Sequence, residues 1–508
     1  MTEYRHDPAL AVWLADRGLS IEQRPGRGRC LITLRSRQPG DLLLETPPVA
    51  FTALDDVAAC DQCGAHKESQ AQLKRCTGCS AVRYCDTTCQ RKAWTSQHAR
   101  ECSALQCIRE TRGVVPPPSL RLAHRVFLGQ TASSLVTRAP WASPELLTSL
   151  ETHRRDVGEE QLLNAAQAAA ALLSYAGKTP DSAETWRIDL DPGKVTDIIL
   201  ALSVNAHAVS DAELRPVGRA LYPLVACANH DCHPSAVLTF RGTTAQLRAT
   251  RALDAGTEVC ISYIDLTATA AERRAELLEG YHFTCNCERC STAFSRGGCA
   301  HDRLIGGASC TGCGAALPLP LTACMVCGST EGHPAAETCN ALALRVKADI
   351  ERSKRLRAGG RHASALQLGS NAVDAVSQLS ATSAVRTRTI DAALHAAIDA
   401  GEWTRALAYA REALPGLIAT HEAPTAQGPA GRNVSPVLGL HHAMLGRLLW
   451  KDAESPGAVR RAAEALDVAV RMLSVTHGRD HPLVGELDQL CREAGAQAAH
   501  QTHAEHLE

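Results

Sequence analysis

The chain has 508 residues, which is more than one hydrophobic core supports, so three or four modules are expected. Its 53 lysine and arginine residues nearly balance its 54 aspartate and glutamate residues. A nucleic acid as the main partner would usually require a basic excess, so this balance argues against one.

The start of the chain, MTEYRHDP, is polar and does not have the pattern of a signal peptide. The most apolar stretch, residues 162–173, is short and contains Asn164 and Gln167. It is predicted to be a buried helix rather than a membrane span. We therefore expect a soluble protein of the cytoplasm or the nucleus, without contact to a membrane.

The first 120 residues alternate between strand signals, cysteine pairs and turns. Residues 20–52 are predicted to form short strands, with strand candidates at 31–34 and 42–44 between glycine-containing turns. Seven cysteines and a metal-capable histidine, His98, follow between residues 60 and 102. Pro116–Pro118 marks a stiff boundary, and beyond it the apolar residues recur at helical spacing to about residue 176.

The second half returns to strands and then becomes helical. Residues 220–264 are strand-like, with a turn at 254–257. From about residue 334 to the end the pattern is helical, apart from a predicted loop at 424–436. Small and aromatic residues around Trp403 and Tyr409 favour antiparallel helix pairs of tetratricopeptide (TPR) type, and the alternative is an ordinary helical bundle.

Fifteen of the 22 cysteines belong to clusters built largely from close pairs, and without a signal sequence such clusters indicate metal rather than disulfides. Four pairs lie between residues 60 and 102, enough for two closed tetrahedral zinc sites, because one tight turn can offer both members of a pair. The alternative is eight scattered thiols. The eight ligands are Cys60, Cys63, Cys76, Cys79, Cys85, Cys89, His98 and Cys102.

Two further clusters lie downstream. Cys285, Cys287 and Cys290 offer three thiolates, so a fourth ligand must come from elsewhere, and Cys232 is the candidate. A last quartet is interpreted as a zinc-ribbon-like site. The alternative is a pair of turns that carry thiols without binding metal. It consists of Cys310, Cys313, Cys324 and Cys327.

Several motifs in a fixed order resemble one known family. Asn229–Pro234 resembles the Asn-His-x-Cys-x-Pro signature of SET domains, and Gly256–Tyr263 is similar to a second SET motif. The cysteines from 285 to 290 resemble a post-SET zinc segment. The cluster at 60–102 resembles a MYND finger, and Thr476–Leu483 resembles the end of a helical domain. Together they resemble the SET-and-MYND lysine methyltransferases over nearly the whole chain.

This resemblance implies an α+β multidomain fold with a β-rich SET core that is split by the inserted MYND finger. It also implies an interleaved pairing in the finger, with Cys60, Cys63, Cys85 and Cys89 on one zinc and the other four ligands on a second. Three or four zinc ions are expected. The implied modules are the N-terminal part of SET (1–55), the MYND finger (56–103), a helical insertion (104–200), core SET (201–268), a post-SET zinc segment (269–295), a zinc-ribbon-like insertion (296–333) and a TPR-like helical domain (334–508).

The resemblance further implies S-adenosyl-L-methionine as the cofactor and a protein lysine, in a histone or another protein, as the substrate. Tyr263 and Tyr281 take the catalytic positions. In the family the MYND finger binds proline-containing peptides. Glu151, beside His153, falls loosely where the family has helical cofactor contacts. The implied cofactor-binding residues are Gly26, Arg27, Gly28, His153, Asn205, Asn229, His230, Tyr263 and Phe283.

The chain departs from the family pattern at Arg29, His207 and Ser235. His207 stands where relatives have a phenylalanine near the lysine channel, so it could alter the number of methyl groups or the choice of substrate. The alternative function is an interaction scaffold built on an inactive SET core. A DNA-binding zinc protein has less support, because the first cluster is only mildly basic and lacks a long recognition helix.

Overall fold

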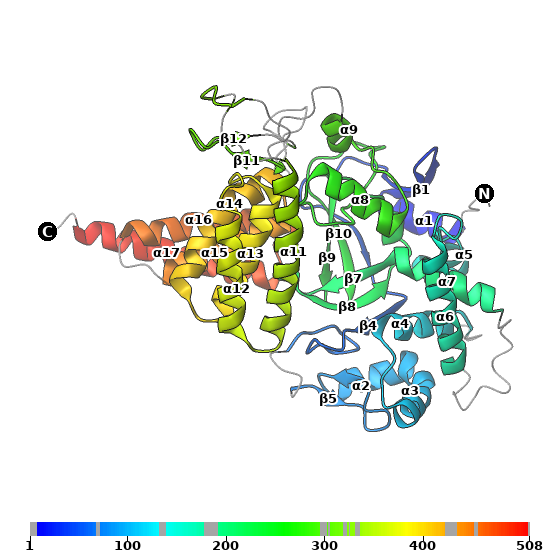
Figure 1. The fold of residues 1–508 in the computed structure, drawn as a ribbon. Coiled ribbons are helices and arrows are strands. Elements are labelled where there is room, and N and C mark those ends of the chain that lie inside the picture. The colour runs from blue at the N-terminus through cyan, green and yellow to red at the C-terminus, as the bar shows by residue number, and fades with distance from the viewer. Residues whose placement is uncertain are drawn as a thin grey trace.

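A computed structural model describes residues 8–67, 72–131, 139–176, 191–294, 302, 305–317, 323–324, 326–330, 336–421, 434–451 and 456–505. It consists of a central strand-rich core with a small cysteine-rich lobe on one side and a stack of helices on the other (Figure 1). Segments far apart in the sequence form the core. The predicted loop at 424–436 lies mostly outside the described residues.

Small antiparallel sheets make up the core. Strand β10 lies between β3 and β9, and strand β8 lies between β4 and β7, so residues 42–53 pair with residues 206–249 across the inserted lobe. Apolar side chains from both segments share one buried cluster. The strands are β1 (Leu19–Arg24), β2 (Gly28–Thr33), β3 (Leu42–Thr46), β4 (Ala50–Ala53), β7 (Ala206–Ser210), β8 (Pro216–Leu221), β9 (Ala236–Arg241) and β10 (Thr244–Ala249).

The second SET-like motif forms little regular structure. Residues 253–261 form no named strand and join the core through isolated bridges, Arg37 with Leu253, Ile32 with Glu258 and His230 with Ile261, and through further hydrogen bonds. The strand-like pattern there reflects extended backbone that crosses neighbouring segments. This crossing brings the end of that motif directly beside the Asn229–His230 pair.

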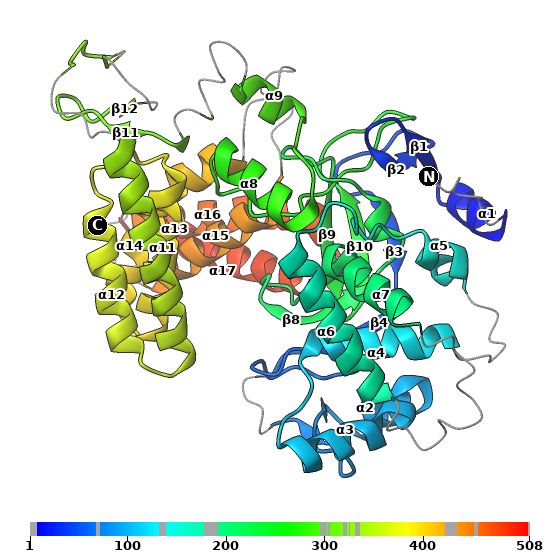
Figure 2. The ribbon, with the colours of Figure 1, turned by 45° about the vertical axis from the view of Figure 1, so that its right-hand side comes forward.

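The cysteine-rich lobe packs on the core's lower side, and the helices that follow it continue along the right-hand side of the core (Figures 1 and 2). Helix α3 (Ala99–Arg112) begins inside the cysteine cluster and continues ten residues beyond its last ligand, Cys102. The other elements of this region are β5 (Lys74–Arg75), β6 (Arg83–Tyr84), α2 (Thr87–Ala93), α4 (Pro118–Thr131), α5 (Pro144–Thr148), α6 (Glu159–Ala176) and α7 (Pro192–Asn205).

Two sequence predictions for this region were wrong. Helix α6 contains the apolar stretch 162–173, but it is amphipathic rather than buried, and Leu163 is 58% exposed. Glu151 and His153 do not lie on a helix but in the loop between α5 and α6, where His153 has a left-handed backbone with φ of 47°. The helical spacing of apolar residues across 119–176 hid this interruption. No described helix has the length and hydropathy needed to cross a bilayer.

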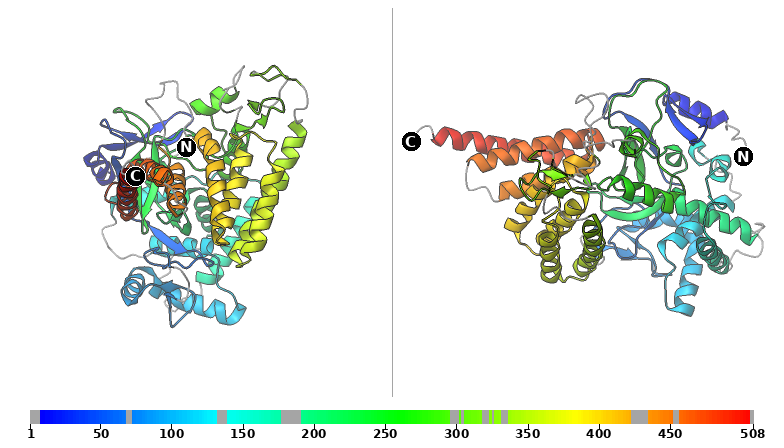
Figure 3. Two further views of the ribbon diagram at one scale, coloured as in Figure 1. Left: turned by 90° about the vertical axis from the view of Figure 1, so that its left-hand side faces the viewer. Right: turned by 45° about the horizontal axis from the view of Figure 1, so that its top comes forward.

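The C-terminal half is a stack in which each helix packs on the next, and the last helices extend away from the core (Figure 3). A small hairpin of β11 (Ala308–Ser309) and β12 (Ala316–Leu317) lies at the edge of this stack, where Ala308 bridges to Leu379. The stacked helices are α11 (Ala336–Ala358), α12 (His362–Ala375), α13 (Ala384–Asp399), α14 (Trp403–His421), α15 (Pro436–Lys451), α16 (Pro456–Thr476) and α17 (Pro482–Glu505). Two shorter helices, α8 (Ala270–Tyr281) and α9 (Glu288–Phe294), precede the stack.

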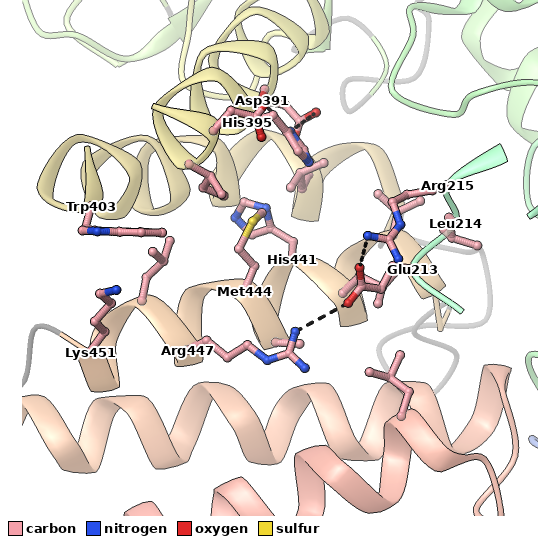
Figure 4. Close-up of a pocket in the computed structure, with 18 of the residues that line it drawn as sticks. Glu213, Leu214, Arg215, Asp391, His395, Trp403, His441, Met444, Arg447 and Lys451 are labelled. Atoms are coloured by element: carbon pink, nitrogen blue, oxygen red, sulfur yellow. Dashed lines mark hydrogen bonds and ion pairs between the residues drawn. The ribbon is translucent and has the colours of Figure 1, made fainter. Parts of the chain in front are cut away.

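A groove at the junction of core and helical stack shows how the two are joined (Figure 4). Glu213, in the β7–β8 loop, accepts ion pairs from its neighbour Arg215 and from Arg447 on α15. At the far end Lys451 lies over the ring of Trp403, 3.8 Å from its centroid. The Arg447–Glu213 pair links this loop to the stack, whereas the Arg215–Glu213 pair lies within the loop.

Candidate active site and zinc centres

The structure gathers the eight ligands of the first cluster into two separate quartets, in which the ligand atoms lie within 4.8 Å of one another. The Sγ atoms of Cys63 and Cys85 are 3.3 Å apart, and those of Cys76 and Cys102 are 3.7 Å apart. Sulfur atoms at the corners of a zinc tetrahedron with bonds of about 2.3 Å lie about 3.8 Å apart, so both sites fit zinc. The quartets are Cys60, Cys63, Cys85 and Cys89, and Cys76, Cys79, His98 and Cys102.

A buried charged network supports the second quartet. Glu101 lies 2.9 Å from Nδ1 of His98, which leaves Nε2 of that ring facing Cys76. Arg125, from helix α4, pairs with Glu101 and with Asp61, and all three side chains are almost fully buried. Although burial opposes it, the Arg125 guanidinium holds the pKa of Glu101 well below its usual range. A carboxylate that is hydrogen-bonded to the second ring nitrogen of a histidine ligand fixes the ring for metal binding. Here the same carboxylate also pairs with Arg125 and so ties the lobe to α4.

A third quartet joins the SET-like signature to the segment after α8. Cys232 meets the three downstream cysteines, and its Sγ lies 3.5 Å from that of Cys290. The ring of His230 bridges this centre and Tyr263, because Nε2 lies 3.2 Å from the Cys232 sulfur and Nδ1 accepts from the Tyr263 backbone N–H. The members are Cys232, Cys285, Cys287 and Cys290.

The fourth quartet lies in the hairpin beside the helical stack. Its sulfur atoms approach as closely as those of the other centres, 3.6 Å between Cys310 and Cys327 and 3.7 Å between Cys313 and Cys324. Two of its cysteines, Cys313 and Cys327, are exposed, whereas no ligand of the other three quartets is exposed. The arrangement fits a zinc ribbon on the surface.

We expect four zinc ions per chain in freshly purified protein, because four quartets have the ligand set and spacing of closed zinc sites. Elemental analysis against a protein concentration from amino-acid analysis checks this number. The Cys310→Ser variant should retain three ions and its helical content, since its quartet is the exposed one. Two or fewer zinc ions per wild-type chain would contradict the assignment of the four quartets as zinc sites.

Tyr263 lies at the centre of the remaining candidate residues. Its hydroxyl donates to the carbonyl of Ala228 at 2.9 Å, and its ring lies 4.8 Å from that of Tyr281. The Tyr281 hydroxyl in turn donates to the Tyr263 carbonyl at 3.3 Å. Burial, reinforced by Tyr281, raises the pKa of Tyr263 above its usual range, so the phenol stays neutral.

Both tyrosines line a cavity of about 270 Å³ whose wall comes from five places in the chain. The end of α7 and strand β7 contribute Asn205 and His207, and residues 261–263 contribute the opposite side. Ala226 and Leu238 provide apolar surface. A mostly apolar, narrow space bounded by aromatic rings suits an amine-bearing side chain in its uncharged or methylated form.

The glycine turn of the β1–β2 hairpin lies next to this region. Gly26 and Gly28 have left-handed backbones, φ of 71° and 66°, and no atom lies within 4 Å of where a Cβ would stand. The amide of Asn229 donates to the carbonyls of Arg27 and Arg29 and to Glu258. Asn229 therefore holds the turn in place, and the open space beside the glycines fits a cofactor that the backbone could approach closely.

The other predicted cofactor residues lie around this centre. Phe283 packs near His230, with ring centroids 6.2 Å apart. The Asn205 amide donates to the Glu151 carbonyl, so it holds the loop that carries His153. The ring of His153 lies 5.3 Å from that of His282, the residue between Tyr281 and Phe283. Although the predicted helix is absent, this loop thus still reaches the rim of the site.

Two of the three residues that depart from the family pattern make hydrogen bonds to other parts of the core or to α5. The Ser235 hydroxyl donates to the Glu258 carbonyl and accepts from the Cys260 N–H, so it joins the two SET-like motifs. Arg29 donates to the hydroxyl of Ser149 at 2.7 Å, which ties β2 to the end of α5. The third, His207, lines the cavity beside the tyrosines.

Sequence reasoning missed the residues that support the ligands and the turn. Glu258 pairs with Arg27 at 2.8 Å and accepts from Asn229, yet it was considered only as part of a motif. Glu101 follows His98 by three residues on helical backbone, a spacing that could have identified it as the partner of a zinc-binding histidine. No local sequence pattern could have identified the role of Arg125, because its partners are distant in sequence.

Comparisons with known proteins agree with this geometry. A family model of the MYND finger matches residues 60–102. Histone-lysine N-methyltransferase ASHR1 of Arabidopsis thaliana is 27% identical over 505 residues, which cover 98% of this chain and 99% of that protein. Histone-lysine N-methyltransferase SMYD3 of Mus musculus is 27% identical over 475 residues, which cover 92% of this chain and 96% of that protein.

Over most of its length the chain is similar to SET-and-MYND lysine methyltransferases, and it contains a MYND finger. N-lysine methyltransferase SMYD2-A of Xenopus laevis is 31% identical over 277 residues, covering 54% of this chain and 61% of that protein. The match to the MYND finger model begins and ends at members of the two quartets, Cys60 and Cys102. The fold is the expected one, a SET core with an inserted MYND finger and a helical C-terminal region.

Proposed function

We propose that the chain is an S-adenosylmethionine-dependent protein-lysine N-methyltransferase that acts on histones or other proteins. The observation that carries the proposal is the meeting of Tyr263 and Tyr281 in one narrow cavity beside the glycine turn. The relatives named above are described as lysine methyltransferases, which supports the same reading. An inactive scaffold is the less favoured alternative, because the tyrosines and the Asn229–His230 pair are present and in contact with the site.

When bound, S-adenosylmethionine supplies an electrophilic methyl group on a sulfonium ion. The proposed cradle is the Gly26–Gly28 turn, the loop at Asn229 and His230, and the ring of Phe283. The protein provides no nucleophile, because the lysine amine is the nucleophile. Its task is to align the two reactants and to keep the amine uncharged.

The cavity residues perform this alignment. The apolar wall disfavours the ammonium form of lysine and so lowers its pKa. Because the Tyr263 hydroxyl hydrogen is directed to Ala228, the phenolic oxygen can accept an N–H of the amine and aim its lone pair. Aimed in this way, the lone pair would face the methyl group that S-adenosylmethionine supplies when it is bound. The new ammonium is stabilised by the Tyr263 and Tyr281 faces until it loses a proton to water.

Labelled S-adenosylmethionine with a panel of core histones and cytosolic proteins tests the function. We expect wild type to label at least one protein at lysine and the Tyr263→Phe variant to label it far more weakly. Mass spectrometry of the labelled protein locates the residue. No lysine label from folded, zinc-loaded wild type over a broad panel would favour the scaffold.

Asn229→Ala should weaken binding of S-adenosylhomocysteine severely, by about tenfold or more, since lost hydrogen bonds to charged and backbone groups cost about 1.5–3 kcal/mol. The physical reason is that the Asn229 amide holds two carbonyls of the glycine turn. Calorimetry measures the affinity. Ser262→Ala, whose hydroxyl contacts only the backbone of Ile264, is the matched control. Undiminished binding by Asn229→Ala would remove this residue from the site.

The MYND finger and the helical stack are the proposed surfaces for protein partners, and a proline-containing peptide is the proposed ligand of the finger. Thiolate zinc centres need reduced cysteines, which supports the cytoplasm or the nucleus as the proposed location.

A further inference from the structure

The four cysteine quartets differ in how far solvent reaches their sulfur atoms. Cys313 and Cys327 are exposed, and they are the only exposed cysteines in the part of the chain that the structure describes. Both belong to the fourth quartet, whose ligand atoms lie within 4.8 Å of one another. The ligands of the other three quartets are buried or half-buried. A small reagent dissolved in water therefore meets the fourth quartet first.

The exposure follows from the two turns that carry this quartet. The N–H of Gly314 donates to the Cys310 carbonyl, and the N–H of Gly328 donates to the Cys324 carbonyl. Both glycines have left-handed backbones with φ of 72°. Each turn buries its first cysteine and exposes its second. Because two turns of the same form meet, both exposed sulfur atoms belong to one metal centre, and each has a buried sulfur beside it.

The hairpin that carries the first turn is attached to the helical stack by hydrogen bonds that do not involve the quartet. Ser309 donates its backbone N–H to the Gln378 carbonyl and its hydroxyl to the Leu379 carbonyl. Ser380 donates its N–H to the Gly307 carbonyl. These bonds attach the hairpin to the turn between α12 and α13 independently of zinc. The fourth quartet can therefore lose its ion while the hairpin stays in place.

We propose that the fourth quartet is a site of reversible oxidation, at which hydrogen peroxide converts thiolates to a disulfide and so releases the zinc ion. The proposal is independent of the proposed methyltransferase function. Zinc binds cysteine as the thiolate, which is also the nucleophilic form of the side chain. Oxidation of a thiolate depends on its exposure and is reversible where a second cysteine lies within reach. Among the four quartets, this one has both properties at exposed sulfur atoms.

The reaction needs only the cysteines and peroxide. The Cys327 thiolate attacks one peroxide oxygen, so an S–O bond forms, the O–O bond breaks and hydroxide leaves. The Cys310 sulfur, 3.6 Å away, then attacks the sulfenic sulfur, and a second hydroxide leaves as the S–S bond forms. Two electrons pass from the two sulfur atoms to peroxide. Cys313 and Cys324, 3.7 Å apart, can react in the same way. A disulfide is not a thiolate ligand, so the zinc ion dissociates.

Stepwise addition of hydrogen peroxide to full-length, zinc-loaded protein tests the proposal. A chromogenic chelator measures the released zinc, and we expect one of the four ions to be released before the other three. Mass spectrometry after proteolysis between Cys313 and Cys324 should find the first disulfide within the fourth quartet. Dithiothreitol and added zinc should restore four ions. A first disulfide elsewhere, or oxidation of other cysteines before any zinc is released, would overturn the proposal.

Two variants identify the centre that releases the first ion. Cys310→Ser removes a resolving cysteine and should start with three ions and lack the early release. Cys491→Ser is the control, because Cys491 is a half-buried cysteine of α17 outside the four quartets, and this variant should respond like wild type. Melting temperature shows that both variants are folded, and the disulfide mapping decides the question from wild type alone. Early zinc release that persists in Cys310→Ser contradicts the assignment.

Discussion

The Tyr263→Phe variant should lose methyl transfer by a factor on the order of 10² or more, while its affinity for S-adenosylhomocysteine changes little. The change removes one hydroxyl and leaves the ring, so the 4.8 Å packing against Tyr281 is retained. The phenolic oxygen acts mainly when the amine is aligned for transfer. Its loss therefore lowers turnover more than binding.

Folding should change only moderately in this variant. The Tyr263 hydroxyl also donates to the Ala228 carbonyl, and leaving that acceptor unpaired costs about 1–3 kcal/mol of unfolding free energy. Turnover, cofactor affinity and melting temperature are measured on one sample. A purely structural tyrosine predicts that turnover and cofactor affinity fall together with stability, and near-wild-type turnover would refute the catalytic assignment.

Tyr281→Phe provides the comparison. Its hydroxyl donates to the backbone carbonyl of Tyr263 at 3.3 Å, a longer hydrogen bond than that of Tyr263 itself. We expect a smaller loss of turnover, because the aromatic face that stabilises the cation is kept. A larger loss in Tyr281→Phe than in Tyr263→Phe would reverse the assigned roles.

The features that depend on short sequence spacing could be predicted from the sequence. Cysteine pairs with two or three residues between them can share a turn, so the clusters were evident from the spacing. The resemblance supplied the grouping into quartets that the structure has. Strand β2 and its glycine turn were also predictable, because left-handed glycines leave a clear signal. The catalytic assignment itself depended on the resemblance, since an isolated Tyr263 is more often structural.

The features that depend on long-range contact could not be predicted. Arg125 meets Glu101 and Asp61 only after the lobe has docked on α4, and no local pattern records that contact. The break before α6 was hidden because apolar spacing continued across it, yet Asn205 holds the Glu151 carbonyl at that break. Such contacts arise from tertiary packing, which overrides local periodicity.

Cys232→Ser should remove one zinc ion and most cofactor binding together. This cysteine is the one member of its quartet that comes from the SET signature, and the others lie more than fifty residues downstream. Its quartet packs in one buried cluster with Tyr263, Tyr281 and Phe283. Without the metal the three downstream thiols have no fixed partner, so the segment carrying Tyr281 and Phe283 should loosen from the core.

The Cys310→Ser variant is the matched control, because it also loses one ion but from the exposed hairpin beside the helical stack. We expect three zinc ions in each variant, with S-adenosylhomocysteine binding weakened at least about tenfold only in Cys232→Ser, as is typical when a metal's supporting contacts are lost. Zinc analysis, calorimetry and melting temperature are measured on both. Equal cofactor affinity in the two variants would show that the third zinc centre does not support the site. A loss in Cys232→Ser alone ties zinc binding to the geometry around Tyr263, through the His230 ring that contacts both Cys232 and the Tyr263 backbone.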